Sequence, residues 1–154
     1  MSIVTYRTEL DDMQHNILAK EQSIEYAVER FNQPKQIVEM LIDVFRINKQ
    51  AEEYLYMFAL NADGMILGVF ELSHGSVNYT VCNPRDIFIK ALLCGAVNIV
   101  LAHNHPSGNT SPSKADMEAY KHVSEAGDLI GIDLIDNIII GNDRYYSFKE
   151  HEIA

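Results

Sequence analysis

Residues 97–116 read VNIVLAHNHPSGNTSPSKAD, and this stretch decides the expected fold class. It opens with a short, almost wholly apolar run, as in a buried strand. A polar loop follows from Asn104 to Pro112. Ser113 is placed as the N-cap of a helix that runs to about Ala126, with Gly127 as its stop. The stretch therefore predicts a strand, a loop and a helix in direct succession.

The chain on either side of this stretch continues the alternation of helices and strands. Proline at a helix start, apolar residues at helical spacing and turn residues between apolar runs mark the elements. The expected elements are a helix from Pro34 to about Asn48, strands 53–60, 65–72 and 79–81, a helix opened by Asn83-Pro84 and ended by Gly95, a strand 130–140 and the segment 145–148. This pattern predicts an α/β fold, with a mixed β-sheet and helices packed on it.

The first part of the chain, residues 1–33, gives weaker signals. Ile3–Tyr6 is compatible with a short strand, and Ser23–Phe31 with a helix that has Ser23 as its N-cap. We therefore divide the chain into an N-terminal extension of uncertain structure, residues 1–33, and one domain, residues 34–154.

The composition excludes some classes of partner. The 154 residues carry a formal net charge of −10, which offers no basic surface to nucleic acid or anionic membranes. No apolar run reaches the roughly 18 residues of a membrane span, and the start, MSIVTYRTELDD, lacks a signal-peptide layout. Cys82 and Cys94 stand among apolar residues, as buried thiols do in a reducing cytosol. We expect a cytoplasmic protein that does not contact membranes or bind nucleic acid directly.

The polar loop is flanked by residues that suit a metal ion. His103 and His105, at positions i and i+2 of a strand end, project from the same face. Asp116 stands eleven residues after His105, in the first turn of the next helix, and can return to the same spot. Two imidazoles and a carboxylate form a three-ligand zinc set whose fourth position stays open, as in catalytic sites. The pattern predicts Zn²⁺ bound by these residues.

Each part of the pattern also has a simpler interpretation. A lone His-x-His at a strand end is often only the polar entry to a loop. Ser113 and Asp116 have the spacing of a capping box, and Asp116 suits the positive end of the helix dipole. The ordered pattern His-x-His-Pro-x6-Ser-x-x-Asp is far more specific than any of these parts.

This pattern resembles the JAMM signature of JAB/MPN+ metallopeptidases, and HNHPSGNTSPSKAD is similar to its form in the bacterial RadC family. The resemblance extends from about Pro34 to Phe148 and includes NPRDIFIKAL before the histidines and LIDNIIIG with YYSF after them. It implies a three-layer, cytidine-deaminase-like JAB/MPN fold, in agreement with the expected mixed sheet. It also implies zinc ligation by the two histidines and Asp116.

The resemblance implies two further roles. Ser113 would stabilise a tetrahedral intermediate by hydrogen bonding to the developing oxyanion. A glutamate ahead of the first long strand would act as general acid and base, and Glu53 matches that place. Glu52 is adjacent, and Glu71 on the next strand is expected at the surface, although a shift of one residue would change its face. Ser107 and Gly108 are expected to shape the loop beside the metal.

The sequence departs from the RadC pattern in two places. Asn137 stands where the family usually has a histidine after an aspartate, here Asp136, so any tuning of the site from that position differs. Residues 1–33 contain no glycine, and no helix-hairpin-helix segment of the kind found in full-length RadC proteins is recognisable there. Both this and the acidic charge argue against a role in binding DNA.

Several functions remain open at this point. The first is hydrolysis of an amide or isopeptide bond in a peptide or protein substrate. The alternative is a metal-binding interaction module without turnover, of a RadC-like family associated with DNA processing. A deaminase would need His-x-Glu and Pro-Cys-x-x-Cys, which are absent, and a nuclease is disfavoured by the acidic surface. The helix from Pro34 and the aromatic strand 53–60 are equally suited to a homo-oligomer interface.

Overall fold

The unit expected from residues 97–116 is present as strand β5 (Asn98–Asn104), a loop and helix α3 (Lys114–Ile130). Ser113 caps this helix, because its hydroxyl accepts a hydrogen bond from the backbone N–H of Asp116 at 3.0 Å. The predicted stop at Gly127 is wrong, since that residue lies inside the helix. A side chain there would place its Cβ 2.3 Å from the carbonyl oxygen of Ile132, so Gly127 permits close packing.

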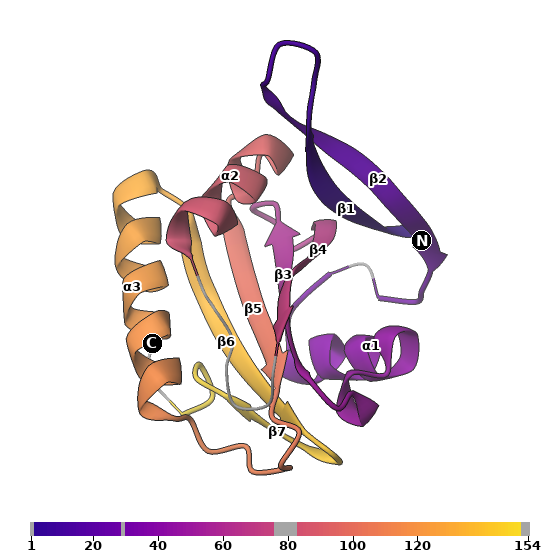
Figure 1. Cartoon of the computed structure of the whole chain (residues 1–154). Helices are drawn as coiled ribbons and strands as arrows, with labels where there is room; N and C mark the ends of the chain where they lie inside the picture. The colour runs from indigo at the N-terminus through magenta and orange to yellow at the C-terminus, as the bar shows by residue number, and fades with distance from the viewer. Residues whose placement is uncertain (1, 29, 76–82, 152–154) are drawn as a thin grey trace.

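The structure is a computed structural model that describes residues 2–28, 30–75 and 83–151. Within these residues the chain forms a seven-stranded mixed sheet in the order β2-β1-β4-β3-β5-β6-β7 (Figure 1). The pairs β1–β4 and β5–β6 are parallel and the others antiparallel. The remaining elements are β1 (Ser2–Leu10), β2 (Asn16–Glu25), α1 (Pro34–Phe45), the 3₁₀ helix η1 (Ile47–Lys49), β3 (Glu53–Leu60), β4 (Ile66–Gly75), α2 (Pro84–Cys94), β6 (Asp133–Gly141) and β7 (Arg144–Ser147).

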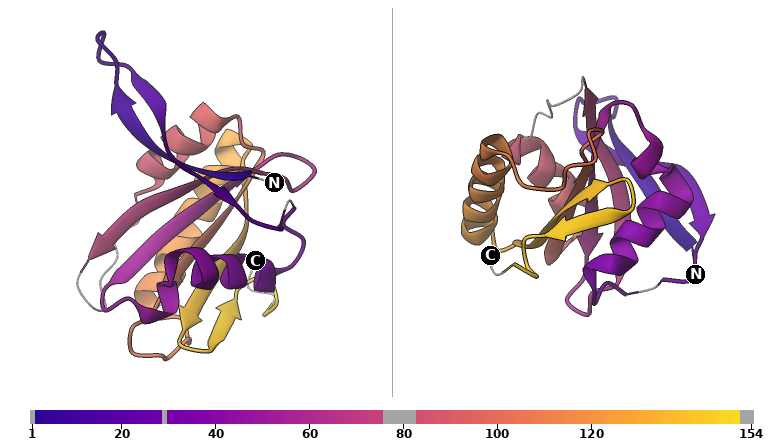
Figure 2. Two further views of the ribbon diagram at one scale, coloured as in Figure 1. Left: turned by 90° about the vertical axis from the view of Figure 1, so that its right-hand side faces the viewer. Right: turned by 90° about the horizontal axis from the view of Figure 1, so that it is seen from below.

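Helices cover both faces of the sheet, so the architecture has the three layers expected. Helix α1 lies on one face, and α2 and α3 lie on the other (Figures 1 and 2). Each interface holds its own buried apolar cluster. Met40, Leu41 and Phe58 belong to the cluster on the α1 side, and Phe70 and Phe88 to the cluster on the α2 and α3 side. In the described part of the chain, no helix combines the length and apolar character that crossing a bilayer requires.

Most predicted elements are present, with shifted ends. Strand β3 has the predicted bounds, and α2 has Asn83 as its N-cap and Gly95 as its left-handed C-cap. Helix α1 ends at Phe45 and continues into η1, and β4 extends to Gly75. Strand β6 begins at Asp133, because α3 continues to Ile130. The strand predicted at 79–81 and the second cysteine, Cys82, lie outside the described residues.

The aromatic strand suggested for an interface lies instead in the interior. Strand β3 pairs with β4 on one side and β5 on the other, and Met57, Phe58 and Ala59 have no exposed surface. Apart from the partly exposed Tyr54, every residue of the strand is buried.

The N-terminal residues form a hairpin that extends the same sheet. The predicted short strand at Ile3–Tyr6 is confirmed but runs the length of β1. The helix predicted over Ser23–Phe31 is wrong: Ser23 lies in β2, paired with Val4 of β1. Cross-strand pairing, which involves residues far away in the sequence, has overridden the local helix signal. The tip of the hairpin projects beyond the rest of the molecule (Figures 1 and 2).

Candidate metal centre

The two histidines of the motif are held at the end of β5. His103 is the last residue of this strand that is paired with β3, opposite Leu55, and it also lies opposite Ile139 in β6. His105 follows the strand and remains tied to the sheet, because its N–H donates to the carbonyl of Ile140 at 2.9 Å. Both imidazoles therefore start from rigid backbone.

The ring of His105 has a fixed orientation. Its Nδ1 lies 2.7 Å from the carbonyl oxygen of Asn109, in the loop that follows. A carbonyl oxygen can only accept, so Nδ1 carries the hydrogen, and Nε2 of the neutral ring presents its lone pair to the site. A contact of this kind is typical of metal-binding histidines.

Asp116 is held by the capping box that the spacing predicted. Its Oδ2 accepts a hydrogen bond from the N–H of Ser113 at 2.8 Å, while the hydroxyl of Ser113 accepts from the N–H of Asp116. The two interpretations of this pair are therefore compatible. The capping box begins α3, and it also orients the Asp116 carboxylate toward the histidines.

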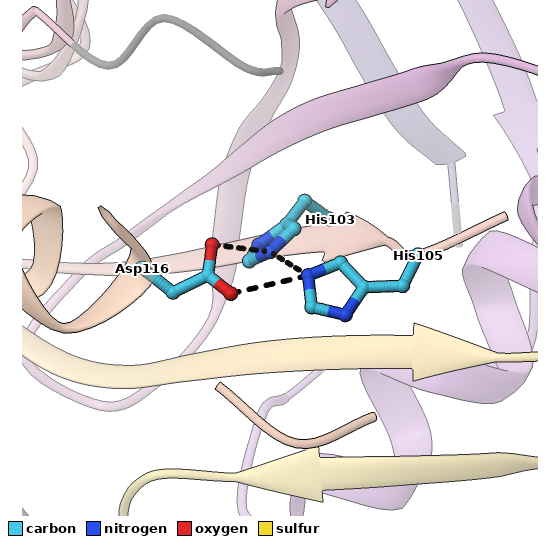
Figure 3. A group of neighbouring side chains, drawn as sticks. All are labelled: His103, His105 and Asp116. Carbon is cyan, nitrogen blue, oxygen red and sulfur yellow. Dashed lines mark hydrogen bonds and ion pairs between the residues drawn. The ribbon is translucent and has the colours of Figure 1, made fainter. Parts of the chain in front are cut away.

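The three side chains converge on one point (Figure 3). The Nε2 atoms of His103 and His105 are 3.2 Å apart, and they lie 3.2 and 3.1 Å from the Oδ1 and Oδ2 atoms of Asp116, respectively. A tetrahedral dication with ligand distances near 2.0 Å requires donor atoms about 3.3 Å apart. One donor atom from each residue lies within 4.8 Å of the other two, so the group could hold a metal ion.

The electrostatics of the group favour a positive charge beside Asp116. Burial alone would raise the pKa of this carboxyl, but hydrogen bonds and charge from His103 and His105, with the N–H of Ser113, hold it well below its usual range. Burial would lower the pKa of His105, yet hydrogen bonds to Asp116 and Asn109 and the charges of Asp116 and Glu53 raise it. The same field would attract a dication.

Of the three candidate glutamates, the structure brings Glu53 to the metal site. Glu53 is 5% exposed, and its Oε1 lies 4.0 Å from Nε2 of His105. The Glu52 side chain is half exposed and lies 3.9 Å from His74. Glu71 lies opposite Tyr56, whose ring packs in the α1-side cluster. Glu71 therefore belongs to the other face of the sheet.

A pocket of about 380 Å³ opens beside the three ligands. Its lining combines apolar residues of the sheet and α3 with a few polar groups: Leu55, Leu101, Ala119, Tyr120, Ser113 and Asn137. Asn137 lies opposite Leu101, which is two residues before His103 in β5, and is 5% exposed. Asn137, which stands where the RadC pattern has a histidine, thus lines the pocket.

Ser107 and Gly108 belong to the loop that closes one side of the pocket. Gly108 has a φ of +83°, and a Cβ there would lie 2.7 Å from the Nδ2 atom of Asn142. The backbone conformation favours glycine, and any other side chain would displace the end of the Asn142 side chain. The loop is therefore fixed against the β6–β7 turn.

The other described histidines are not part of this group. His15 lies in the hairpin turn, His122 is exposed on α3, and His151 stacks on Tyr146. His74 lies on β4 and stacks on Tyr54.

The sequence interpretation overlooked Asn104, which it placed in the loop. Asn104 ends β5, is 2% exposed and hydrogen-bonds to β3 through its side chain. A signal was present: between two residues that face one side of a sheet, the middle residue must face the other. If that side is buried, a polar side chain there needs hydrogen-bond partners.

Sequence comparison agrees with this geometry. The pattern of the RadC-like JAB domain family matches residues 31–153. The chain belongs to this family. Relatives of this RadC-like JAB domain include a "UPF0758 protein" of Clostridium tetani, 41% identical over 120 residues, which are 78% of this chain and 52% of the relative. Another, from Geotalea uraniireducens, is 38% identical over 124 residues, 80% of this chain and 54% of the relative.

The match locates the site within the shared part of these proteins. The RadC-like JAB domain includes every residue of the metal group as well as Glu53 and Ser113. The chain spans about half the length of the curated relatives it matches.

Proposed function

We propose that this chain is a zinc-dependent hydrolase that cleaves an amide or isopeptide bond in a peptide or protein substrate. The observation that carries the proposal is the convergence of His103, His105 and Asp116 at the mouth of a pocket that also holds the buried Glu53. Three protein ligands with an open side toward a pocket are the arrangement of catalytic rather than structural zinc. Bound there, zinc would supply a water molecule with a pKa near 7 as the nucleophile.

Glu53 is suited to hold and pass on a proton. Its Oε1 lies 4.0 Å from Nε2 of His105, which places the carboxylate beside the group that would hold the metal. A carboxylate beside a metal-bound water would accept its proton and deliver it to the leaving amine. The low exposure of Glu53 keeps bulk water away from this transfer.

Ser113 is suited to stabilise the negative charge that develops on the substrate carbonyl oxygen. Its Oγ accepts the N–H of Asp116, so its own hydroxyl hydrogen is oriented away from the helix backbone. The residue lines the pocket together with the ligands. A donor fixed in this way before the reaction stabilises an oxyanion with little reorganisation.

Two measurements test the proposal. The first is the metal content of the purified protein by elemental analysis: about one zinc ion per chain is expected, and it is lost in the His103→Ala/His105→Ala variant. No zinc, even after zinc is added back, would contradict the proposal.

The second measurement is hydrolysis of linear peptides and of lysine isopeptides by the zinc-loaded protein. Glu53→Gln is expected to retain zinc and to lose about a hundredfold or more of the rate. Glu71→Gln is the matched control, because it removes a carboxylate from the opposite face of the sheet. Zinc binding without turnover on any of these substrates would instead support the metal-binding interaction module.

A further inference from the structure

Asn104 connects the metal-binding strand to the strand that carries Glu53. Its Oδ1 accepts a hydrogen bond from the N–H of Tyr54 at 2.7 Å, and its Nδ2 donates to the carbonyl of Glu52 at 3.0 Å. The two partners are the residues immediately before and after Glu53. Asn104 is 2% exposed, so neither bond competes with bulk water.

These side-chain bonds take the place of backbone pairing at the point where β3 and β5 stop pairing. The β3–β5 ladder ends with the pair Leu55 and His103, and the next residues in register are Tyr54 and Asn104. There the carboxamide of Asn104 takes the place of a peptide group. Its orientation is unambiguous, because an N–H needs an acceptor and a carbonyl needs a donor.

We propose that Asn104 is a positioning residue that fixes Glu53 relative to the metal ion. The bonds on both sides of Glu53, together with its pairing to Gly75 of β4, set the position of its Cα, and hence the direction in which the carboxylate enters the pocket. The neighbours of Asn104 in the sequence are the ligands His103 and His105. The base and the ligands are therefore held by one strand end, although they come from distant parts of the chain. This inference rests on the proposed role of Glu53.

The candidate ligands are held by contacts that do not involve the Asn104 side chain. An effect of Asn104 on Glu53 can therefore be distinguished from a general effect on the site. His103 is paired on both sides in the sheet, and His105 is held by the carbonyls of Ile140 and Asn109. Asp116 is held by its capping box. Loss of the Asn104 side chain is therefore expected to release Glu53 more than the ligands.

A double-mutant cycle on Co²⁺ affinity tests the inference without an activity assay. A carboxylate roughly 5 Å from a dication strengthens binding by about tenfold, even in high dielectric, so Glu53→Gln should weaken Co²⁺ binding by about that factor. Asn104→Ala should weaken it by roughly threefold, because the carboxylate moves away. The double variant should bind within about twofold of Glu53→Gln alone.

Asn61→Ala is the matched control. The Asn61 side chain likewise makes two hydrogen bonds to the backbone, accepting from the N–H groups of Asp63 and Met65 at 2.9 Å each, but at the opposite end of β3. It should leave Co²⁺ affinity unchanged. Asn104→Ser, too short to bridge both partners, replaces the alanine variant if that variant does not fold. If the effects of Asn104→Ala and Glu53→Gln multiply in the double variant, Asn104 supports the ligands and the inference is overturned.

Crystal structures of the metal-free wild type and of the Asn104 variant complete the test. The carboxylate of Glu53 is expected to move by about 1 Å or more, with His103 and His105 in place. An unmoved carboxylate would overturn the inference. Failure of the wild type to bind any metal would sink the proposed function, and these structures would still decide whether Asn104 positions Glu53.

Discussion

The strand that carries two of the candidate metal ligands and the outermost strand of the N-terminal hairpin belong to one sheet, but different interactions determine their structure. In β5 every residue after Asn98 is buried, and the strand is paired on both sides. In β2 no residue is buried, and within the described residues it pairs with β1 alone. The comparison shows that β5 is determined by burial, whereas β2 depends on the pairing that its neighbour offers.

The hairpin joins the rest of the sheet between β1 and β4. Among the described residues, β1 and β4 share one registered pair, Thr5 and Val69. Tyr6 and Leu18 of the hairpin nevertheless pack against the cluster on the α2 and α3 side. The hairpin is thus attached at its base, while its tip extends into solvent. We expect substitutions in the two regions to differ widely in effect.

The largest difference concerns metal affinity. Asp116→Ala removes one of three ligands and is expected to weaken zinc binding on the order of a thousandfold. Met13→Ala, at the hairpin tip, should leave it unchanged. Isothermal titration with zinc measures both. Equal affinities would show that Asp116 is a helix cap and no ligand.

The next difference concerns stability. Phe58 has no exposed surface in the centre of the sheet, and Phe58→Ala is expected to cost about 3–5 kcal/mol of unfolding free energy. Ile17 in β2 is 42% exposed, and Ile17→Ala should cost less than about 0.5 kcal/mol. Urea denaturation gives both values. A large effect at Ile17 would mean that its side chain buries more apolar surface than its exposure indicates.

Cys94 reports on the junction itself. It ends α2 and packs in the cluster that Tyr6 and Leu18 also contact. Burial raises the pKa of its thiol to about 11, so alkylation by iodoacetamide at pH 8 should be about a hundredfold slower than for a free cysteine. Leu18→Ser should increase the rate if the hairpin provides the cover. An unchanged rate would assign the protection to the helices.

The smallest effect is expected from a buried carboxyl in the body of the domain. Burial raises the pKa of Asp136, although Ser147 and the N–H groups of Asn137 and Lys149 bind its carboxylate and oppose this rise. Its ionisation is thus less favourable in the folded chain, and stability is lost as pH rises from the ordinary carboxyl pKa to the raised one. In Asp136→Asn that loss is absent.

The stability of Asp136→Asn relative to wild type should therefore increase with pH across this window and then remain constant. Denaturation at a series of pH values measures the difference, in which the other titrating groups cancel. A difference that decreases with pH would mean that the hydrogen bonds stabilise the charged form of Asp136 more than burial opposes it.

The sequence predicted the elements whose signals are local. Asn83 and Ser113 cap helices because their side chains bond to N–H groups two or three residues away, which spacing alone reveals. The hairpin was mispredicted for the opposite reason, since Ser23 is in a strand only because Val4 lies beside it. Gly127 was mistaken for a helix end because a glycine needed for close packing has no distinct local signature.

The same distinction between local signals and contacts of distant residues applies to the candidate site. The convergence of His103, His105 and Asp116 followed from spacing, since they lie at the two ends of one loop. The choice of Glu53 over Glu71 rested on the resemblance to the RadC family, whereas the pairing register shows the face of the sheet that each side chain occupies. The contacts of Asn104 were not predictable, because its partners lie 50 and 52 residues away.

This division has a consequence for the order in which the site assembles during folding. The ligands are joined by a short loop, whereas Asn104 and Tyr54 must close one of about fifty residues. That longer closure adds roughly 1 kcal/mol of chain entropy. The three candidate ligands can thus come close within a short segment of the chain, whereas Glu53 reaches them only when β3 has paired with β5.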